Sequence, residues 1–262
     1  MDLNADLGEA EMVLPRDLAV LAEVSSANIA CGFHAGNVEV MRETCREAVS
    51  RGVAIGAHVS YRDREGFGRR PLEVSDGELS DDLVEQCRTL QQSAASSGGV
   101  VAYVKPHGAL YHRMGTDPQV ALVVLHAMSL CRIPLLLSAP GEVVAKAAGS
   151  GEVAVTVVFE GFADRAYRRD GTLVPRGEEG AVLDDPVEVA RRAVSLAVRG
   201  GVEADDGSWV EVRCDSICVH GDSPGAAASS RAVRAALVDA GVTVGPFADR
   251  FPIPPSAGPS TR

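Results

Sequence analysis

Residues 26–58 read SANIACG-FHAGN-VEVMRETCREAVSR-G-VAIGAH, and their pattern sets the architecture of the chain. Two short apolar runs, Ser26–Gly32 and Val53–His58, flank an amphipathic segment, Val38–Arg51, whose apolar residues recur at helical spacing. Gly52 follows this segment and can adopt the positive φ that ends many helices. A strand, a helix and a strand in this order predict one right-handed unit of a parallel sheet.

The same unit recurs along the chain. Five further apolar runs of strand length are Met1–Asp6, Val100–Lys105, Ile133–Ser138, Val153–Phe159 and Ser216–His220. Further segments of helical length are Asp76–Ser97, Asp117–Cys131, Gly141–Ala148, Asp185–Arg199 and Ser223–Ala240. Continuous apolar runs are typical of parallel strands that are buried on both faces. Seven such runs in 262 residues predict an α/β fold, an irregular seven-stranded β/α barrel, with an open doubly wound sheet as the alternative.

The chain carries no obvious linker. Residues 200–208 are rich in glycine and aspartate and favour a loop, and too few residues follow them for another domain. We therefore expect residues 1–250 to form a single barrel domain. Residues 251–262 contain four prolines and no helical period, which predicts an irregular C-terminal tail.

The composition narrows the classes of partner. Twenty-five basic and 36 acidic residues give a net charge of −11, which disfavours nucleic acid, and the two lysines, Lys105 and Lys146, form no basic run for a membrane surface. Six scattered cysteines without a C-x-x-C pair indicate a reducing compartment. With no signal peptide or long apolar stretch in the sequence, we expect a cytoplasmic protein that binds small molecules or other proteins.

Ionisable and amide side chains gather at the C-terminal ends of the predicted strands. They are Asn4, Asp6, Glu9, His34, His58, Lys105, His107, Glu160, His220 and Asp222. Barrel enzymes build their active sites at this end. A single histidine at a strand end is as often structural as functional, but four histidines beside a carboxylate and a lysine favour an active site.

The sequence allows more than one chemical role for these side chains. Lys105 directly follows an apolar run, so it forms a buried ion pair, holds an anion, polarises a carbonyl or acts as a base. A divalent metal could be bound by residues drawn from Asp6, His34, His58, His107 and Asp222. Their spacing matches no compact metal motif, so acid–base chemistry is the favoured interpretation. The sequence also lacks a P-loop, a G-x-G-x-x-G turn and a G-x-S-x-G elbow.

Segments in several parts of the chain closely resemble the LamB/YcsF family. They are DLNADLGE (2–9), SSANIACGFHAG (25–36), GFGRR (66–70), KPHGALY (105–111), FADR (162–165), DGTL (170–173) and CVHGD (218–222). The resemblance runs from residue 2 to about residue 241. The sequence departs from the family at Asn37, where aspartate is usual, at Val59, where proline is usual, and at His112, where asparagine is common. The segment after Glu9 is also shortened.

The resemblance implies a barrel of the glycoside hydrolase/deacetylase type. It also implies ATP-dependent opening of the lactam of 5-oxo-L-proline to L-glutamate, an activity shared with B and C subunits. ATP, with Mg²⁺, is then expected on this chain or on one of its partners. Two alternatives are a metal-dependent, deacetylase-like amide hydrolase that acts alone and a non-catalytic subunit that binds the lactam.

For lactam hydrolysis we expect the site residues to divide into two groups. Asp6 or His58 would activate water, and Lys105 with His107 would stabilise the charge that develops on oxygen. The residues expected to bind substrate are Asn4, Glu9, His34, Glu160, Asp164, Arg165, His220 and Asp222. Among them, Arg165 is a candidate to hold the substrate carboxylate.

Overall fold

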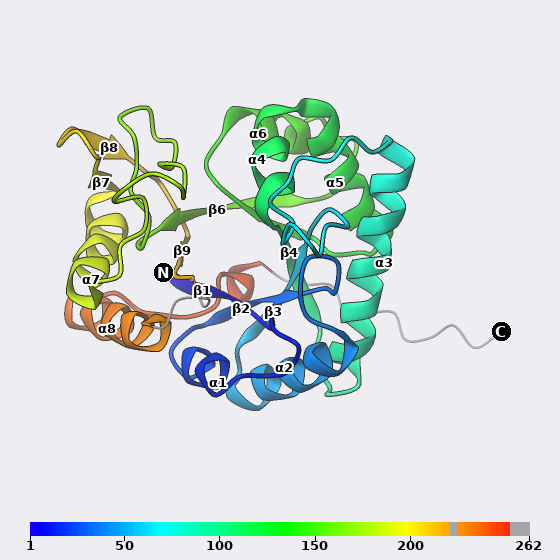
Figure 1. Cartoon of the computed structure of the whole chain (residues 1–262), viewed down its shortest axis with the longest axis horizontal. Helices are drawn as coiled ribbons and strands as arrows, with labels where there is room; N and C mark the ends of the chain where they lie inside the picture. The colour runs from blue at the N-terminus through cyan, green and yellow to red at the C-terminus, as the bar shows by residue number, and fades with distance from the viewer. Residues whose placement is uncertain (221–224, 252–262) are drawn as a thin grey trace.

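A computed structural model describes residues 1–220 and 225–251. Seven parallel strands close into a barrel (Figure 1). In barrel order they are β1 (Asp2–Leu7), β2 (Ser26–Ala30), β3 (Ala54–Val59), β4 (Val101–Pro106), β5 (Leu135–Ser138), β6 (Thr156–Phe162) and β9 (Ser216–Cys218). β9 pairs with both β6 and β1 and so closes the ring. The predicted seven-stranded barrel is confirmed, and the open sheet is wrong.

Helices surround the barrel (Figure 1). They are α1 (Pro15–Leu21), α2 (Val38–Arg51), α3 (Asp76–Ala95), α4 (Gly108–Thr116), α5 (Pro118–Leu130), α6 (Glu142–Gly149), α7 (Pro186–Val194) and α8 (Ala226–Asp239). A π-helical turn (Ser195–Arg199) extends α7, and a 3₁₀ turn (Phe247–Arg250) follows α8. Among the described residues, no helix combines the length and the apolarity that crossing a membrane requires.

Local capping explains where the predicted helices begin and end. The Asn37 side chain accepts a hydrogen bond of 2.9 Å from the Val40 N–H at the start of α2, and Gly52 ends that helix at φ 67°. Asp117 caps α5 in the same way, ahead of Pro118, whose missing N–H is harmless in the first turn. These caps fix the direction in which the chain returns to the next strand.

Some predicted boundaries were wrong. The stretch 200–208, predicted as a loop, contains β7 (Gly201–Glu203), which forms an antiparallel hairpin with β8 (Trp209–Glu211). Two helices, α1 and α4, were missed because seven and nine residues carry too little periodic signal. The start of the predicted helix Ser223–Ala240 and most of the predicted tail, residues 252–262, lie outside the described residues.

Polar side chains fill much of the barrel interior, whereas the main apolar core lies between strands and helices. Asp2, Asn4 and Asp6 alternate along β1 with Leu3, Ala5 and Leu7, which belong to the outer core. Deep in the barrel, the Asp2 carboxylate accepts hydrogen bonds from the hydroxyls of Ser25, Ser26 and Ser216. Because buried polar groups are costly unless paired, this network stabilises one arrangement of the strands beneath the mouth.

Gly56 and Tyr103 pack closely inside the barrel. A Cβ added at Gly56 would lie 2.1 Å from Cε2 of Tyr103, whose ring is fully buried. The Gly56→Ala variant is therefore expected to lower the free energy of unfolding by at least about 1–3 kcal/mol in a urea titration followed by circular dichroism. Gly77→Ala, at an exposed position in α3 with nothing within 4 Å, is the control and should be neutral or stabilising. Equal stability of the two variants would contradict this packing.

Candidate active site

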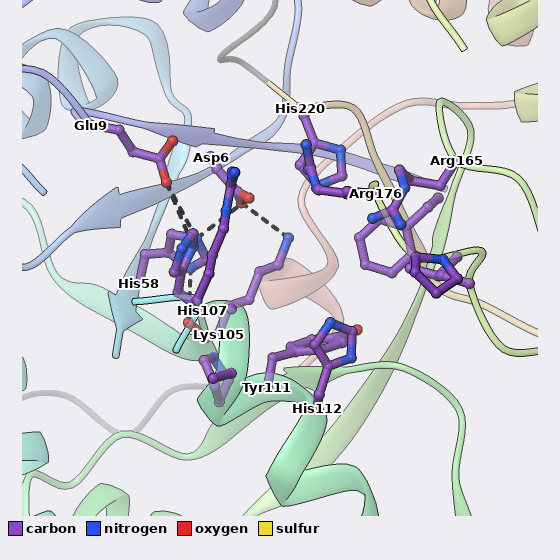
Figure 2. Close-up of a pocket in the computed structure, with 17 residues that line it drawn as sticks. Asp6, Glu9, His58, Lys105, His107, Tyr111, His112, Arg165, Arg176 and His220 are labelled. Carbon is purple, nitrogen blue, oxygen red and sulfur yellow. Dashed lines mark hydrogen bonds and ion pairs between the residues drawn. The ribbon is translucent and has the colours of Figure 1, made fainter. Parts of the chain in front are cut away.

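A cavity of about 440 Å³ opens at the C-terminal ends of the barrel strands (Figure 2). Its lining includes Asp6, Glu9, His58, Arg69, Lys105, His107, Tyr111, His112, Phe162, Arg165, Arg176 and His220. This size suits a small molecule. The cavity lies where barrel enzymes place their chemistry.

Lys105, at the end of β4, is the buried cation at the base of this cavity. Its ammonium donates to Asp6 Oδ1 at 3.0 Å and lies 3.0 Å from Glu160 Oε2. Burial disfavours its charge, but Asp6 and Glu160 outweigh burial and hold the pKa of Lys105 well above its ordinary value. Lys105 is therefore a fixed positive charge, which favours its interpretation as an ion-pair partner or electrostatic group over that as a base.

Asp6, at the end of β1, connects Lys105 to the histidines. Its Oδ1 also accepts from Asn28 Nδ2 at 2.8 Å, and its Oδ2 lies 3.4 Å from His58 Nε2. Burial raises the pKa of this carboxyl, but the charges of His58 and Lys105 more than offset that effect and lower it well below its ordinary value. Asp6 is thus an ionised carboxylate that lines the cavity (Figure 2).

Three histidines and Glu9 form a compact cluster beside Asp6, hereafter the histidine cluster (Glu9, His34, His58 and His107). The rings of His34 and His107 stack with centroids 4.0 Å apart, and His58 Nε2 lies 2.9 Å from His107 Nδ1. Burial lowers the pKa of His34 well below its ordinary value and that of His107 to about 2, whereas Asp6 raises the pKa of His58 despite its burial. Both His34 and His107 are therefore neutral imidazoles.

The loop after β3 positions these rings. Gly68 (φ 66°) lies so close that a Cβ there would be 2.9 Å from His34 Cβ. Phe67 also has a positive φ, of 54°, which is uncommon for a residue with a side chain, and its carbonyl accepts a hydrogen bond of 2.9 Å from His107 Nε2. Gly108 lets the chain after β4 approach this loop, because a Cβ there would lie 2.4 Å from the Gly68 carbonyl oxygen.

The opposite side of the cavity carries Arg165, Arg176 and His220 (Figure 2), and His220 is hydrogen-bonded to Asp164, which does not itself line the cavity. Arg165 donates to the carbonyls of Val174 at 2.6 Å and Ala181 at 3.2 Å, which hold its guanidinium in place. Burial and the neighbouring charge of Arg176 lower the pKa of Arg165. Asp164 accepts from His220 twice, from its backbone N–H at 2.8 Å and from its ring at 2.9 Å. This side can present positive charge to an anionic ligand.

Most of the candidate site residues gather at this mouth. Asn4 and Glu160 lie beneath Lys105, His34 lies behind His107, and Asp164 supports His220. The candidate Asp222 lies outside the described residues. Lining residues missed from the sequence are Arg69, Tyr111, His112, Phe162 and Arg176. Arg69, Tyr111 and Phe162 lie within quoted motifs and could have been included, whereas Arg176 has no strand-end pattern to mark it.

The chain is thus a β/α barrel protein with a charged cavity for a small molecule at the C-terminal ends of its strands. The sequence profile of the LamB/YcsF family matches residues 1–251. The chain therefore belongs to the LamB/YcsF family.

Curated relatives align over nearly the full chain. The A subunit of 5-oxoprolinase from Streptomyces griseus subsp. griseus is 52% identical over 95% of this chain and 100% of its own length. The protein of the same name from Paracidovorax citrulli is 49% identical over 95% of this chain and 99% of its own. A solved structure, the lactam utilization protein from Thermus thermophilus, is 40% identical and superposes with a TM-score of 0.87 over 94% of this chain and 99% of that one.

Proposed function

We propose that this chain is the A subunit of a 5-oxoprolinase and that its barrel mouth opens the lactam of 5-oxo-L-proline to L-glutamate. Relatives about half identical over their full length carry that name, and the similar solved structure is of a lactam utilization protein. The observation that carries the proposal is the fixed Lys105 ammonium, held between two carboxylates at the base of a cavity that can hold a small molecule.

The reaction makes three demands on the site. An amide is stabilised by resonance, so its carbonyl needs activation, a water must lose a proton as its oxygen bonds to the carbonyl carbon, and the ring nitrogen must gain a proton as the C–N bond breaks. Asp6 is the carboxylate placed to accept the proton of water, because it is ionised and lines the cavity. His58, whose pKa Asp6 raises, is the candidate to give a proton to the leaving nitrogen.

Lys105 is the group best placed to stabilise negative charge on the lactam oxygen. Lys105 lines the cavity and its charge is fixed before substrate arrives, which is the condition for electrostatic stabilisation of a transition state. Besides the two carboxylates, its ammonium contacts Asn4 Oδ1 at 3.3 Å and Cys218 Sγ at 3.2 Å, so the lactam oxygen would replace one of these longer contacts. Both ring nitrogens of His107 already have contacts, with Phe67 O and His58 Nε2, so His107 is less suited to the oxygen-stabilising role expected from the sequence. Across the cavity, Arg165 and Arg176 would attract the substrate carboxylate.

ATP and partner subunits complete the proposal. Transfer of the γ-phosphoryl group of ATP, with Mg²⁺, to the lactam oxygen would release ADP and activate the carbonyl carbon. Addition of water to that carbon, with cleavage of the C–N bond and protonation of the ring nitrogen, would then give the γ-phosphate of glutamate, and a second water would release phosphate and glutamate. Because the sequence has no P-loop, we place the nucleotide on or beside the B and C subunits. The glutamate-forming step would then occur in the cavity described above.

The test is glutamate release from 5-oxoproline with ATP and Mg²⁺, measured for the purified chain alone and then with B and C subunits from the same organism. We expect glutamate release only when the B and C subunits are present. Activity of the single chain would place the ATP chemistry in this barrel and contradict the shared assignment. Activity in neither case would contradict the proposed function.

A second function is favoured by the histidine cluster. Three imidazoles and a carboxylate at the mouth of a barrel also suit a metal-dependent amide hydrolase that acts alone. Hydrolysis of 5-oxoproline or of an acetylated amine by the single chain, without ATP, would favour this alternative. Strict dependence on ATP would exclude it.

A further inference from the structure

We propose that Glu9, His34, His58 and His107 bind one divalent metal ion of the zinc class. Their ligand atoms, Glu9 Oε1, His34 Nε2, His58 Nε2 and His107 Nδ1, all lie within 4.8 Å of one another. Whether the ion binds can be measured without the lactam reaction, and only a role for the ion in opening the lactam rests on the proposed function. With the ion on its Nε2, His58 could not also give a proton to the leaving nitrogen, so the ion would take over that part of the site. In each ring the other nitrogen points away from this cluster, and its hydrogen bond determines whether the inner nitrogen is free to bind the ion.

Each outward nitrogen faces an acceptor, which fixes the tautomer of its ring. His58 Nδ1 lies 3.0 Å from the carbonyl oxygen of Lys105, so it must donate. His107 Nε2 must donate to the carbonyl oxygen of Phe67 for the same reason. His34 Nδ1 lies 3.0 Å from Ser60 Oγ, whose single proton is donated to the carbonyl of Tyr61, so Ser60 accepts from His34. Metal-binding histidines show this second hydrogen bond almost always.

The inward nitrogens are therefore lone pairs when the rings are neutral, and they converge. Within the described residues, His34 Nε2 is fully buried and has no hydrogen-bond partner, while Glu9 Oε1 lies 3.4 Å away. His58 Nε2 and His107 Nδ1 are 2.9 Å apart, so a proton or a cation must lie between their lone pairs. A metal ion satisfies all three nitrogens at once, whereas one proton can satisfy only one pair.

The separations fit a single ion. Ligand atoms about 2.0–2.2 Å from a tetrahedral zinc ion lie about 3.3–3.6 Å from one another. The separations from Glu9 Oε1 are 3.4 Å to His34, 3.8 Å to His58 and 3.6 Å to His107. The 2.9 Å between His58 Nε2 and His107 Nδ1 is shorter, and this pair would move apart by about 0.4 Å around the ion. Three nitrogens and one carboxylate oxygen suit zinc and its neighbours nickel, cobalt and iron more than magnesium or calcium, which prefer oxygen ligands.

The ion would face the substrate. Glu9, His58 and His107 line the cavity, and His34 closes the site from behind. Such an ion can add a ligand from the cavity, where it would polarise a carbonyl or acidify a bound water. A second group of possible ligands, Asp6, Cys218 and His220, is a poorer candidate because the Lys105 ammonium lies 3.0 Å from Asp6 and 3.2 Å from Cys218 Sγ, where it repels a cation.

The experiment titrates the chelator-treated full chain with Zn²⁺ by calorimetry and with Co²⁺ by visible absorption. The proposal predicts one ion per chain and the intense visible bands of Co²⁺ bound by nitrogen in low coordination. His34→Gln and His107→Gln should each weaken binding more than about 100-fold, because loss of even an outer partner commonly costs 10–100-fold. Ser60→Ala, which removes such an outer partner from His34, should weaken binding about 10–100-fold.

His112→Gln is the matched control, because His112 lines the same cavity outside the set of four. It should keep the affinity of the unchanged chain. Binding of much less than one ion per chain, or equal affinity in His34→Gln and His112→Gln, would overturn the proposal. Glutamate release by a chain that binds no metal would contradict the metal site and leave the proposed function standing. Metal binding without glutamate release would contradict the proposed function and leave the metal site standing.

Discussion

Replacing Lys105 with methionine is expected to lower glutamate release by the assembled enzyme at least about 100-fold, the loss typical of removing a preorganised group that stabilises an oxyanion. The same change leaves Asp6 and Glu160 buried without the ammonium that lies 3.0 Å from each. Breaking a buried ion pair in this way should also lower the free energy of unfolding by about 3–5 kcal/mol. Urea titration and the glutamate assay, run on the same preparation, measure the two effects.

Two further variants separate catalysis from stability. The double variant Lys105→Met/Glu160→Gln removes one negative charge together with the positive one, so it should recover part of the lost stability while turnover stays low. The second lysine of the chain is the control: Lys146 is exposed on α6 and paired with Glu142, so Lys146→Met should cost less than about 1 kcal/mol. Restored turnover in the double variant would show that Lys105 merely neutralises Glu160.

Asp6→Asn is expected to lower turnover by about 100- to 10,000-fold, the usual contribution of a positioned proton acceptor. The amide oxygen can still accept from Asn28 and Lys105, which hold Asp6 Oδ1 at 2.8 and 3.0 Å, so the variant should fold. An amide cannot take the proton of water. Turnover at saturating 5-oxoproline should therefore collapse while the affinity for 5-oxoproline changes little.

Asp17→Asn is the control for this change. Asp17 is a buried carboxylate on α1 that accepts from the Leu14 N–H and does not line the cavity. Its loss should leave turnover near that of the unchanged chain. If Asp6→Asn lost affinity and kept turnover, Asp6 would hold the substrate and another group would activate water.

The barrel was predictable because its signals are local. Apolar runs followed by amphipathic segments with caps such as Asn37 and Gly52 mark each strand and helix within about 20 residues. The polar interior was less evident, although Asp2, Asn4 and Asp6 alternate on β1 in a pattern that indicates one polar face. The β7–β8 hairpin was missed because strands of three residues show no periodicity.

The position of the candidate site could be predicted from the sequence, but the contacts between its side chains could not. The strand-end rule brought His58, Lys105 and Glu160 to one rim, since parallel strands end on the same side. That Lys105 contacts Glu160, 55 residues away in sequence, depends on which inward positions face each other across the closed barrel. The compact histidine cluster depends equally on the loop containing Gly68, whose path no local pattern specifies.

On the proposed function, the lactam reacts in the mouth of this barrel and not on a partner subunit. The most direct measurement mixes the unchanged chain with the Asp6→Asn variant in different ratios. The total concentration of the two is kept constant and below that of the B and C subunits, and the initial rate of glutamate release with ATP is recorded. We expect a rate that falls in proportion to the fraction of variant and approaches zero for the variant alone. A rate independent of that fraction would contradict it, because the chemistry would then belong to one of the partner proteins.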